Sequence, residues 1–267
     1  MGVKISIITV TFNRAHVIKD AIEGVLRQNY KNYEYIIVDG ASKDNTVELL
    51  KEYELKFQAV SADSNGFKPT FRWISEKDNG LYDAINKGIK MATGDVVGII
   101  NSDDYFHRDD IFDAIAGGFK DDETEVIFGN ERIINPENPD VNYRFEAPWY
   151  FRRWMFRFGL EPPHPSFYAR KSCFEKWGYY KMGYVISADF DLMMRFLMIH
   201  KAKYKYVNHT ILTFRNSGIS TDSSNRLMMN KEIVRSCKEN GVWTCLLFVY
   251  CKYFFKIPEL WFGKNRK

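Results

Sequence analysis

The segment Ser75–Asp104 constrains the fold of this chain more than any other stretch of the sequence. It predicts a loop, a helix, a tight turn and a buried strand, followed directly by the adjacent carboxylates of Asp103 and Asp104. In open α/β sheets, ligands bind outside the carboxyl ends of the strands. Hard divalent cations bind proteins through one or two carboxylates together with substrate phosphates. The segment therefore predicts a site for a metal-bound diphosphate at the edge of an α/β sheet.

The first hundred residues repeat this alternation. Short, apolar, β-rich segments predict strands over Lys4–Val10, Tyr35–Val38, Phe71–Ser75 and Val96–Ile100. Apolar residues at helical spacing predict a helix from Val17 that ends near Gln28-Asn29, and another over Leu81–Met91. Between them, Asp44 can cap a helix whose apolar face includes Val47, Leu50 and Tyr53. Strands and helices that alternate at this spacing predict an α/β fold, with a doubly wound, mainly parallel sheet flanked by helices.

The pattern becomes less regular after Asp104. We expect helices over Ile111–Phe119 and Phe190–Ile199, and only a short strand over Val126–Phe128. The proline-rich stretch Asn135–Asp140 predicts a turn-rich connection. The apolar and aromatic segment Val242–Phe255 predicts a helical extension at the end of the chain.

Composition restricts the partners and the compartment. The formal net charge of +4 suits an anionic ligand or membrane surface, and without a basic arm we expect no nucleic-acid partner. The four cysteines show no C-x-x-C spacing, so we expect neither zinc nor disulfides. A reduced, cytoplasmic location is the expectation that follows.

Acidic residues follow predicted strands or precede a predicted helix in three places: Asp39, the Asp103–Asp104 pair and the Ser187–Asp191 segment. Any one of them alone is more often a helix cap or a turn former. Neighbouring like charges repel each other, so the Asp103–Asp104 pair requires a cation or well-placed hydrogen-bond donors. Together, the three features favour a functional site.

Five blocks of sequence extend this interpretation: SIITVTFNR, IIVDGASKDNT, EKDNGLYDAINKGIKMATGD, INSDD and ADFDLMMRF. In this order they resemble the family 2 glycosyltransferases of the GT-A fold, over about residues 3–220. The DNGLYDAINKGI form is similar to the branch that builds bacterial surface polysaccharides such as capsule, colanic acid and O-antigen. The resemblance implies a GT-A-like fold and a nucleotide-sugar donor, for which the family favours UDP.

The resemblance also implies roles for individual residues. Asp39 would receive the base N–H and Phe12 would border the base, while Asp103 would meet the ribose, the metal and the diphosphate. The full set implied to bind the nucleotide or the donor sugar is Val10, Thr11, Phe12, Asp39, Asp44, Asp78, Gly80, Asp83, Ser102, Asp103 and Arg215. Arg215 begins a segment, residues 215–220, that is similar to a flexible lid near the diphosphate in the family.

A divalent cation, Mn²⁺ or Mg²⁺, is implied at Asp103 and Asp104. Many members of the family have a further Asp where this chain has Asn101. The change lowers the negative charge of the site, and it leaves the set of metal ligands open.

For the chemistry, the resemblance implies that Asp189 is the catalytic base of an inverting transfer. Most inverting members have Glu-Asp at this place, whereas this chain has Ala188-Asp189, and Asp191 is the alternative base. A carboxylate within about 3 Å of the acceptor hydroxyl takes its proton as the new bond forms. His164 stands in a loop similar to one on the acceptor side in the family, so His164 and Asp191 are the expected acceptor-side residues.

We therefore expect a GT-A glycosyltransferase domain over residues 1–220, with a nucleotide-binding half (1–104) and an acceptor half (105–220). Residues 221–267 would form an aromatic-rich helical extension. Arginines interleave with aromatic residues over Trp149–Phe158, and Val242–Phe262 is apolar with a basic end. These two segments either cover the core or lie in a membrane interface, and both interpretations stay open. The second would place the protein on the inner face of the cell membrane.

The expected activity is the metal-dependent, inverting transfer of a hexosyl or N-acetylhexosaminyl group to a hydroxyl of a saccharide acceptor. The surface-polysaccharide branch implies that this acceptor is linked to a polyprenyl diphosphate. Two alternatives stay open: a nucleotidyltransferase, and a non-catalytic protein that binds sugar nucleotides. A nucleotidyltransferase would normally carry a Gly-rich loop after the first strand, where this chain has Thr11-Phe12-Asn13-Arg14.

Overall fold

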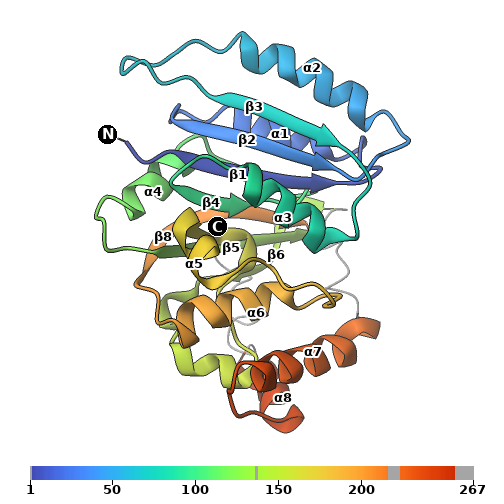
Figure 1. Ribbon diagram of the computed structural model, residues 1–267, viewed down its shortest axis with the longest axis vertical. Coiled ribbons are helices and arrows are strands. Elements are labelled where there is room, and N and C mark those ends of the chain that lie inside the picture. Colours follow the sequence, from blue (N-terminus) through green and yellow to red (C-terminus); the bar gives the residue numbers. More distant parts are fainter. Residues whose placement is uncertain (1, 136–137, 216–222, 256–267) are drawn as a thin grey trace.

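The computed structural model describes residues 2–135, 138–215 and 223–255, and its strands form one eight-stranded sheet (Figure 1). The strand order is β3-β2-β1-β4-β7-β5-β6, and β8 pairs with β5. The strands are β1 (Ile5–Thr11), β2 (Tyr33–Asp39), β3 (Thr70–Ser75), β4 (Val96–Ile99), β5 (Val126–Asn135), β6 (Asn138–Glu146), β7 (Phe167–Arg170) and β8 (Tyr204–Arg215).

Eight α-helices and several short turns of helix accompany the sheet in the described ranges. The α-helices are α1 (Ile18–Leu26), α2 (Thr46–Gln58), α3 (Leu81–Met91), α4 (Ile111–Gly118), α5 (Lys171–Trp177), α6 (Ala188–Met194), α7 (Arg226–Glu239) and α8 (Leu246–Phe255). The 3₁₀ turns are η1 (Pro148–Tyr150), η2 (Arg153–Phe158), η3 (His164–Ser166) and η6 (Ser223–Asn225), and η4 (Arg195–Ile199) is a π-helix.

The first half of the sheet is parallel, as the sequence predicts. Strand β1 lies between β2 and β4, and β3 pairs with β2, all in parallel. The register sets Thr11 opposite Asp39, and Asp39 opposite Ser75. The carboxyl ends of these strands therefore meet at one edge of the sheet, which the loops to α1, α2 and α3 border.

The second half is mixed and differs from the prediction. The strand predicted over Val126–Phe128 continues to Asn135, and β6 begins at Asn138, inside the predicted turn-rich connection. Strand β5 pairs antiparallel with β6 and β7 and parallel with β8, so pairing with distant segments, rather than local composition, sets its length. The helix predicted over Phe190–Ile199 begins at Ala188 and changes to a π-helix at Arg195.

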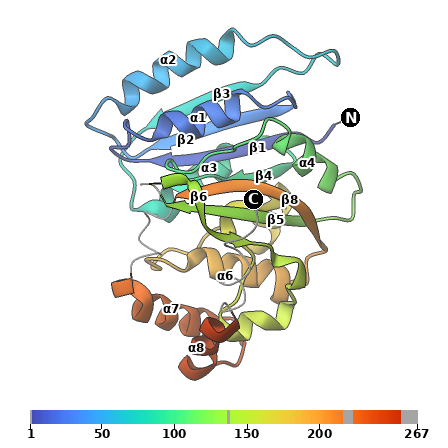
Figure 2. The same ribbon diagram turned by 180° about the vertical axis from the view of Figure 1, so that it is seen from behind.

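Helices cover both faces of the sheet. Apolar side chains alternate along β1: Ile5 and Ile7 join a core with α1, α2 and α4, while Ile8 and Val10 join a core with α3, α5 and α6. Figures 1 and 2 show these two layers from opposite sides. Such alternation buries both faces of the strand, as expected for a sheet flanked by helices.

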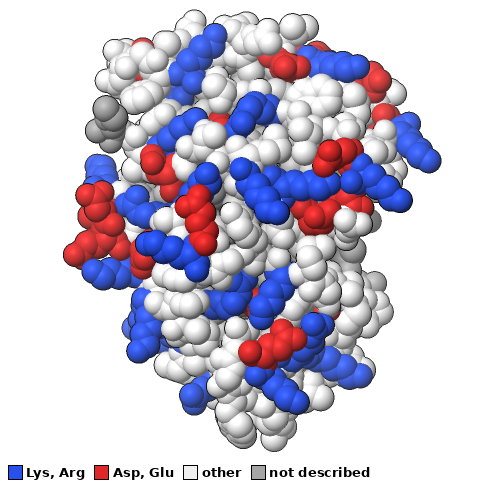
Figure 3. Space-filling model, viewed as in Figure 1, with Lys and Arg blue, Asp and Glu red and all other residues white. Residues whose placement is uncertain are grey.

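Helices α7 and α8 are the last two of the described helices, and they lie beyond α6 at the end of the molecule opposite β3 (Figure 1). Residues 256–267, including the basic residues at the end of the chain, lie outside the described residues. Within the described ranges, no helix is both long enough and apolar enough to cross a membrane. Charges of both signs are interspersed over the face in Figure 3, with Lys and Arg more frequent toward its lower end.

Strand β4 leads into Asn101–Asp104, and its position depends on a glycine. A Cβ atom at Gly98 would lie 1.9 Å from Cε1 of Tyr168, whose buried ring belongs to the neighbouring strand β7. We expect Gly98→Ala to lower the free energy of unfolding by about 1–3 kcal/mol, because the ring cannot move aside in a packed core. The midpoint of urea denaturation measures this loss.

Gly117→Ala is the matched control, because a Cβ there meets no heavy atom within 4 Å. Gly117 lies in α4, where alanine is favoured over glycine by roughly 0.5–1 kcal/mol. The two variants should therefore shift the midpoint in opposite directions. A Gly98→Ala protein as stable as the parent would contradict the packing argument.

Candidate active site

The edge formed by the ends of β1, β2 and β3 brings together the first group of predicted residues. Phe12 follows β1 and exposes 56% of its surface, although it is a large aromatic residue. A Cβ at Gly40 would lie 3.4 Å from Cδ2 of Phe12 and 2.7 Å from Oδ2 of Asp78. Phe12 and Asp78 therefore flank the backbone of Gly40, where a larger residue would not fit.

Asp39 is completely buried at this edge. Its carboxylate accepts hydrogen bonds from the Ser42 backbone N–H (3.0 Å), the Ser75 hydroxyl (2.6 Å) and the Ser42 hydroxyl. It thus ties the loop after β2 to the end of β3. The hydroxyl of Thr11, opposite Asp39, is buried and has no hydrogen-bond partner among the described residues. A buried polar atom without a partner is costly, so a ligand group that pairs with Thr11 would remove that cost.

Asp44 lies in the same loop and binds both the loop before α1 and the first residue of α2. It accepts hydrogen bonds from the Ala15 N–H (3.0 Å) and from the N–H (3.1 Å) and hydroxyl (2.5 Å) of Thr46. Desolvation would raise the pKa of Asp44, but these hydrogen bonds outweigh it and lower the pKa below its usual value. Its observed contacts therefore support the loop between β1 and α1 rather than reach into open space.

The loop before α3 carries Asp78 and Gly80, and Asp83 lies in the first turn of the helix. Gly80 has φ of +106°, a conformation that favours glycine. Asp78 accepts the Gly80 N–H (2.9 Å), and Asp83 accepts the Asn79 N–H (2.9 Å). Carboxylates at the start of a helix are favourable because they face its positive end. Both carboxylates remain partly exposed, and Asp78 lies beside Gly40.

Asp103 and Asp104, although adjacent, have different environments. Asp103 is partly exposed, whereas Asp104 is completely buried. Asp104 accepts hydrogen bonds from the Asn101 side-chain amide (2.8 Å) and from the Arg215 backbone N–H (3.1 Å). Burial, followed by the charge of Asp103, raises the pKa of Asp104 well above its usual value. Ser102, between Asn101 and Asp103, is also buried.

Arg215 closes this side of the site from the end of β8. Its guanidinium donates to the Asp103 backbone carbonyl (3.1 Å), pairs with Asp20 of α1, and lies 5.0 Å from the centre of the Tyr105 ring. The Tyr105 and Thr213 backbones exchange two hydrogen bonds, at 3.2 and 3.0 Å. Residues 216–220 of the expected lid lie outside the described residues.

These residues fit a divalent cation of the kind that Mg²⁺ and Mn²⁺ represent. Within the described ranges, no group of three or more His, Cys, Asp or Glu side chains could hold a metal ion alone. Such cations keep several waters and bind through one or two carboxylates plus substrate phosphates, so the partly exposed Asp103 suffices on the protein side. Asp104 already accepts hydrogen bonds from Asn101 and Arg215, so it would support Asp103 from the buried side.

Asp189 lies at the start of α6, partly exposed, and accepts the N–H of Phe190 (2.8 Å). Burial raises the pKa of Asp189, and the nearby His164 opposes that rise. Burial in turn lowers the pKa of His164, whose Nε2 lies 2.7 Å from the Tyr180 hydroxyl. A carboxylate with a raised pKa is a stronger base, so this environment suits proton abstraction.

Two tyrosines that the sequence did not single out build the surroundings of Asp189. The Tyr82 hydroxyl, from α3, donates to the Ile186 carbonyl (2.5 Å) and accepts the Ala188 N–H (3.2 Å). Tyr82 and Tyr180 stack with ring centres 5.7 Å apart. Tyr82 and Asn86 share one face of α3, and Asn86 exchanges two hydrogen bonds with the Tyr180 backbone, at 2.9 and 3.0 Å. Their i, i+4 spacing in the DNGLYDAINKGI block was the available signal.

Asp191, the alternative base, lies elsewhere and has many partners. It is completely buried and pairs with Arg195 (2.8 Å) and Lys181 (3.0 Å). It also accepts hydrogen bonds from Ser236 of α7 (3.0 Å) and from Asn240, the residue that follows α7 (2.9 Å). Although burial opposes the change, these partners lower its pKa. A carboxylate bound in this way fastens α6 to α7 and is a weak base.

The model of the family described as "Glycosyl transferase family 2" matches residues 6–174, more than half of the chain. The chain belongs to this family. Over 202 residues it is 29% identical to an uncharacterized glycosyltransferase of Mycobacterium tuberculosis, covering 73% of this chain and 69% of that protein. A PGL/p-HBAD biosynthesis glycosyltransferase of Mycobacterium bovis is 24% identical over 218 residues, covering 80% of this chain and 77% of that protein. The protein is a glycosyltransferase.

Solved structures agree on the fold. Staphylococcus aureus TarS in complex with UDP-GlcNAc has a TM-score of 0.60 and 15% identity, covering 87% of this chain and 66% of that one. The mannosyltransferase PcManGT of Pyrobaculum calidifontis, in complex with GDP-Man and Mn²⁺, has a TM-score of 0.62 and 14% identity, covering 98% of this chain and 72% of that one. The fold is therefore GT-A, as the sequence predicts.

The contact between Asn101 and Asp104 can be tested by Asn101→Asp. The change replaces the amide that donates to the buried Asp104 with a carboxylate, which cannot donate. We therefore expect the free energy of unfolding at pH 8 to fall by about 1–3 kcal/mol. An acid whose pKa is raised in the folded state binds more protons there than in the unfolded state, so stability falls as the pH rises through that pKa. The loss should therefore be smaller at pH 5 than at pH 8.

Asn101→Ala is the control, because it removes the donor without adding a charge. Its loss of stability should change less between pH 5 and pH 8 than that of Asn101→Asp, by chemical denaturation at both values. An Asn101→Asp protein as stable as the parent at pH 8 would show that the buried Asp104 does not depend on the hydrogen bond from Asn101.

Proposed function

We propose that this glycosyltransferase inverts the anomeric centre and transfers a sugar from a nucleotide-sugar donor to a hydroxyl of a saccharide acceptor. The proposal includes a role in the synthesis of surface polysaccharide, with a polyprenyl-diphosphate-linked acceptor. A relative named for PGL/p-HBAD biosynthesis and the DNGLYDAINKGI form of the sequence support a surface glycan. Neighbours bound to UDP-GlcNAc and GDP-Man support a nucleotide-sugar donor.

One observation carries the proposal: α3 connects two parts of the candidate site. One is the edge formed by the ends of β1, β2 and β3, which we call the donor edge, and the other is the turn just before Asp189. The loop before α3 contains Asp78, which lies beside Gly40 and Phe12. One residue into the helix, Tyr82 binds the backbone on both sides of Ser187, just before Asp189. The first turn of α3 thus fixes a donor-side carboxylate relative to the candidate base. Holding two reacting groups in a fixed geometry is a large part of catalysis.

The residues would act as follows in a single displacement. The Asp189 carboxylate takes the proton of the acceptor hydroxyl while that oxygen bonds to the anomeric carbon of the donor sugar. The bond from this carbon to the diphosphate oxygen breaks, and its electron pair leaves with the nucleoside diphosphate. Phe12 and Asp39 would hold the base, Arg215 would bind phosphate oxygens, and His164 would face the acceptor.

Asp103 would hold a divalent cation, with Asp104 and Asn101 behind it. The cation, when bound, would supply charge neutralisation for the departing diphosphate. The partly exposed carboxylate of Asp103 and the Mn²⁺ of the mannosyltransferase neighbour support this part of the proposal.

We further propose that residues 1–104 bind the nucleotide, residues 105–220 bind the acceptor and residues 221–267 form an extension. The parallel strands with Phe12, Asp39 and Asp103 at their ends support the first assignment. The environment of His164 and Asp189 supports the second. Helices α7 and α8 support the third within the described residues.

Asp189→Asn tests the base. We expect the transfer rate to fall roughly 10²–10⁴-fold, the range that general base catalysis supplies, because an amide cannot take the proton. The donor is first identified by thermal stabilisation with a panel of nucleotide sugars, with and without Mn²⁺. The donor should stabilise Asp189→Asn as well as it stabilises the parent, because Asp189 is not part of the donor edge.

Asp113→Asn, an exposed acid in the first turn of α4, is the matched control and should transfer at the parental rate. Near-normal transfer by Asp189→Asn would remove Asp189 from the mechanism. If no nucleotide sugar stabilises the protein, the donor proposal fails.

We also propose that an aromatic surface near the end of the chain contacts anionic lipid. This surface consists of Trp154, Phe158, Trp243, Leu247 and Phe248, and it joins η2 to α8. Its rings contact one another in a row, with centres 5.1 to 5.7 Å apart, and Trp154, Trp243 and Leu247 are 50%, 65% and 73% exposed. Exposed tryptophans beside Lys and Arg are typical of helices in a membrane interface.

The variant Trp154→Ala/Trp243→Ala tests this contact by sedimentation with vesicles that contain phosphatidylglycerol. We expect the bound fraction to fall several-fold, because the interface loses its two most amphipathic side chains. Leu55→Ala, an equally exposed apolar site on the distant helix α2, should bind like the parent. If the parent itself stays in the supernatant, the proposed contact is wrong.

A further inference from the structure

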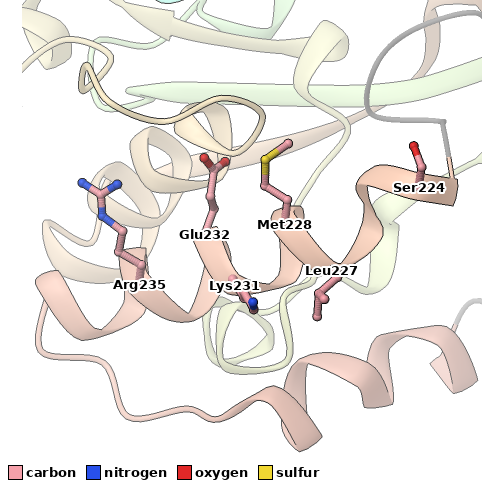
Figure 4. A pocket seen from close by; sticks show the side chains of 6 residues that line it. All are labelled: Ser224, Leu227, Met228, Lys231, Glu232 and Arg235. Carbon is pink, nitrogen blue, oxygen red and sulfur yellow. The ribbon is translucent and has the colours of Figure 1, made fainter.

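Glu232 of α7 has an unusual set of partners for a surface helix. Its side chain is only 8% exposed and accepts three successive backbone N–H groups: those of Val185 (2.7 Å), Ile186 (3.0 Å) and Ser187 (2.9 Å). In Figure 4, Glu232 projects from α7 on the same side as Met228 and Arg235. It forms part of the wall of an open hollow of about 580 Å³ that follows this helix.

These three N–H groups belong to the turn that ends at Asp189. Ala188, the next residue, donates its N–H to the Tyr82 hydroxyl, which itself donates to the Ile186 carbonyl. The turn is therefore held from two sides, by Tyr82 of α3 and by Glu232 of α7. Within the described part of the chain, no side-chain cap holds the start of α6, so these contacts fix where Asp189 lies.

The charge of Glu232 also reaches Asp189. Among the described residues, the titratable groups that act on Asp189 include His164 of η3, Tyr82 of α3, Tyr180 of the loop before the turn, and Glu232 of α7. Burial is the main cause of the raised pKa of Asp189, and His164 opposes it; Glu232 adds a smaller contribution that raises the pKa, because two nearby negative charges disfavour each other. The usual acid before the base is absent here, where Ala188 stands.

We propose that Glu232 is a positioning residue for the transfer reaction: it holds the turn that carries Asp189 and supplies a neighbouring negative charge from α7. The inference rests on the proposed role of Asp189 as the base. It gives α7 a function in catalysis that acts through the position of Asp189.

Glu232→Gln tests the proposal. The change replaces one accepting oxygen with an NH₂ group that faces backbone N–H groups, and it removes the charge. We expect kcat to fall roughly 10–100-fold through displacement of the base, while KM for the donor stays unchanged. The acidic limb of the kcat/KM profile should move to lower pH, because the pKa of Asp189 falls once the neighbouring negative charge is gone.

Two variants separate positioning from a general loss of structure. Glu232→Asp keeps the charge on a shorter side chain, so kcat should fall while the acidic limb stays in place. Glu239→Gln changes another acid of α7, which binds Lys181, Arg235 and Tyr184 but none of the three N–H groups, and should leave kcat and the limb unchanged. Thermal unfolding and donor binding confirm that each variant is folded.

Hydrogen exchange gives a readout that does not depend on activity. The amides of Val185, Ile186 and Ser187 should exchange faster in Glu232→Gln than in the parent or in Glu239→Gln. Faster exchange with unchanged kcat and an unchanged acidic limb would overturn the positioning role and leave the proposed function standing. An active Asp189→Asn protein would overturn both.

Discussion

The hydroxyl group of Tyr82 is the link on which the proposed catalytic arrangement depends. It is buried in the core, donates to Ile186 and accepts from Ala188, so it fixes the backbone just before Asp189. Because Tyr82 lies in the first turn of α3, the same helix end is fixed relative to the donor edge through Asp78 and Gly80. Two parts of the chain about a hundred residues apart thereby act as one unit.

The sequence predicts the parallel half of the sheet well for a physical reason. Each of the strands β1, β2 and β4 is buried on both faces and is largely apolar, and a helix at 3.6-residue spacing follows β1 and β2. The polar residues that follow such runs must lie at the edge. The positions of Asp39 and Asp103 at this edge therefore follow from the sequence alone.

The second half could not be predicted in the same way. Strand β5 owes its ten residues to three neighbouring strands, and β8 pairs with it across more than seventy positions of sequence. The role of Asp191 could not be predicted for a similar reason. Its partners Ser236 and Asn240 lie in α7 and just after it, and the buried face of α7 includes polar residues. Local patterns record which residues are apolar. They do not show which distant polar groups will donate hydrogen bonds to a buried carboxylate.

The contact between β8 and the Asp103–Asp104 loop determines when this edge can be completed. Asp104 receives one of its two donors from the Arg215 backbone, and Tyr105 pairs with Thr213. During synthesis, the loop emerges more than a hundred residues before its partner strand. The parallel strands can assemble as they leave the ribosome, whereas the buried carboxylate gains its last donor only after β8 has been translated. The hydrogen bonds around Asp104 are therefore complete only when a strand more than a hundred residues farther along the chain has been made.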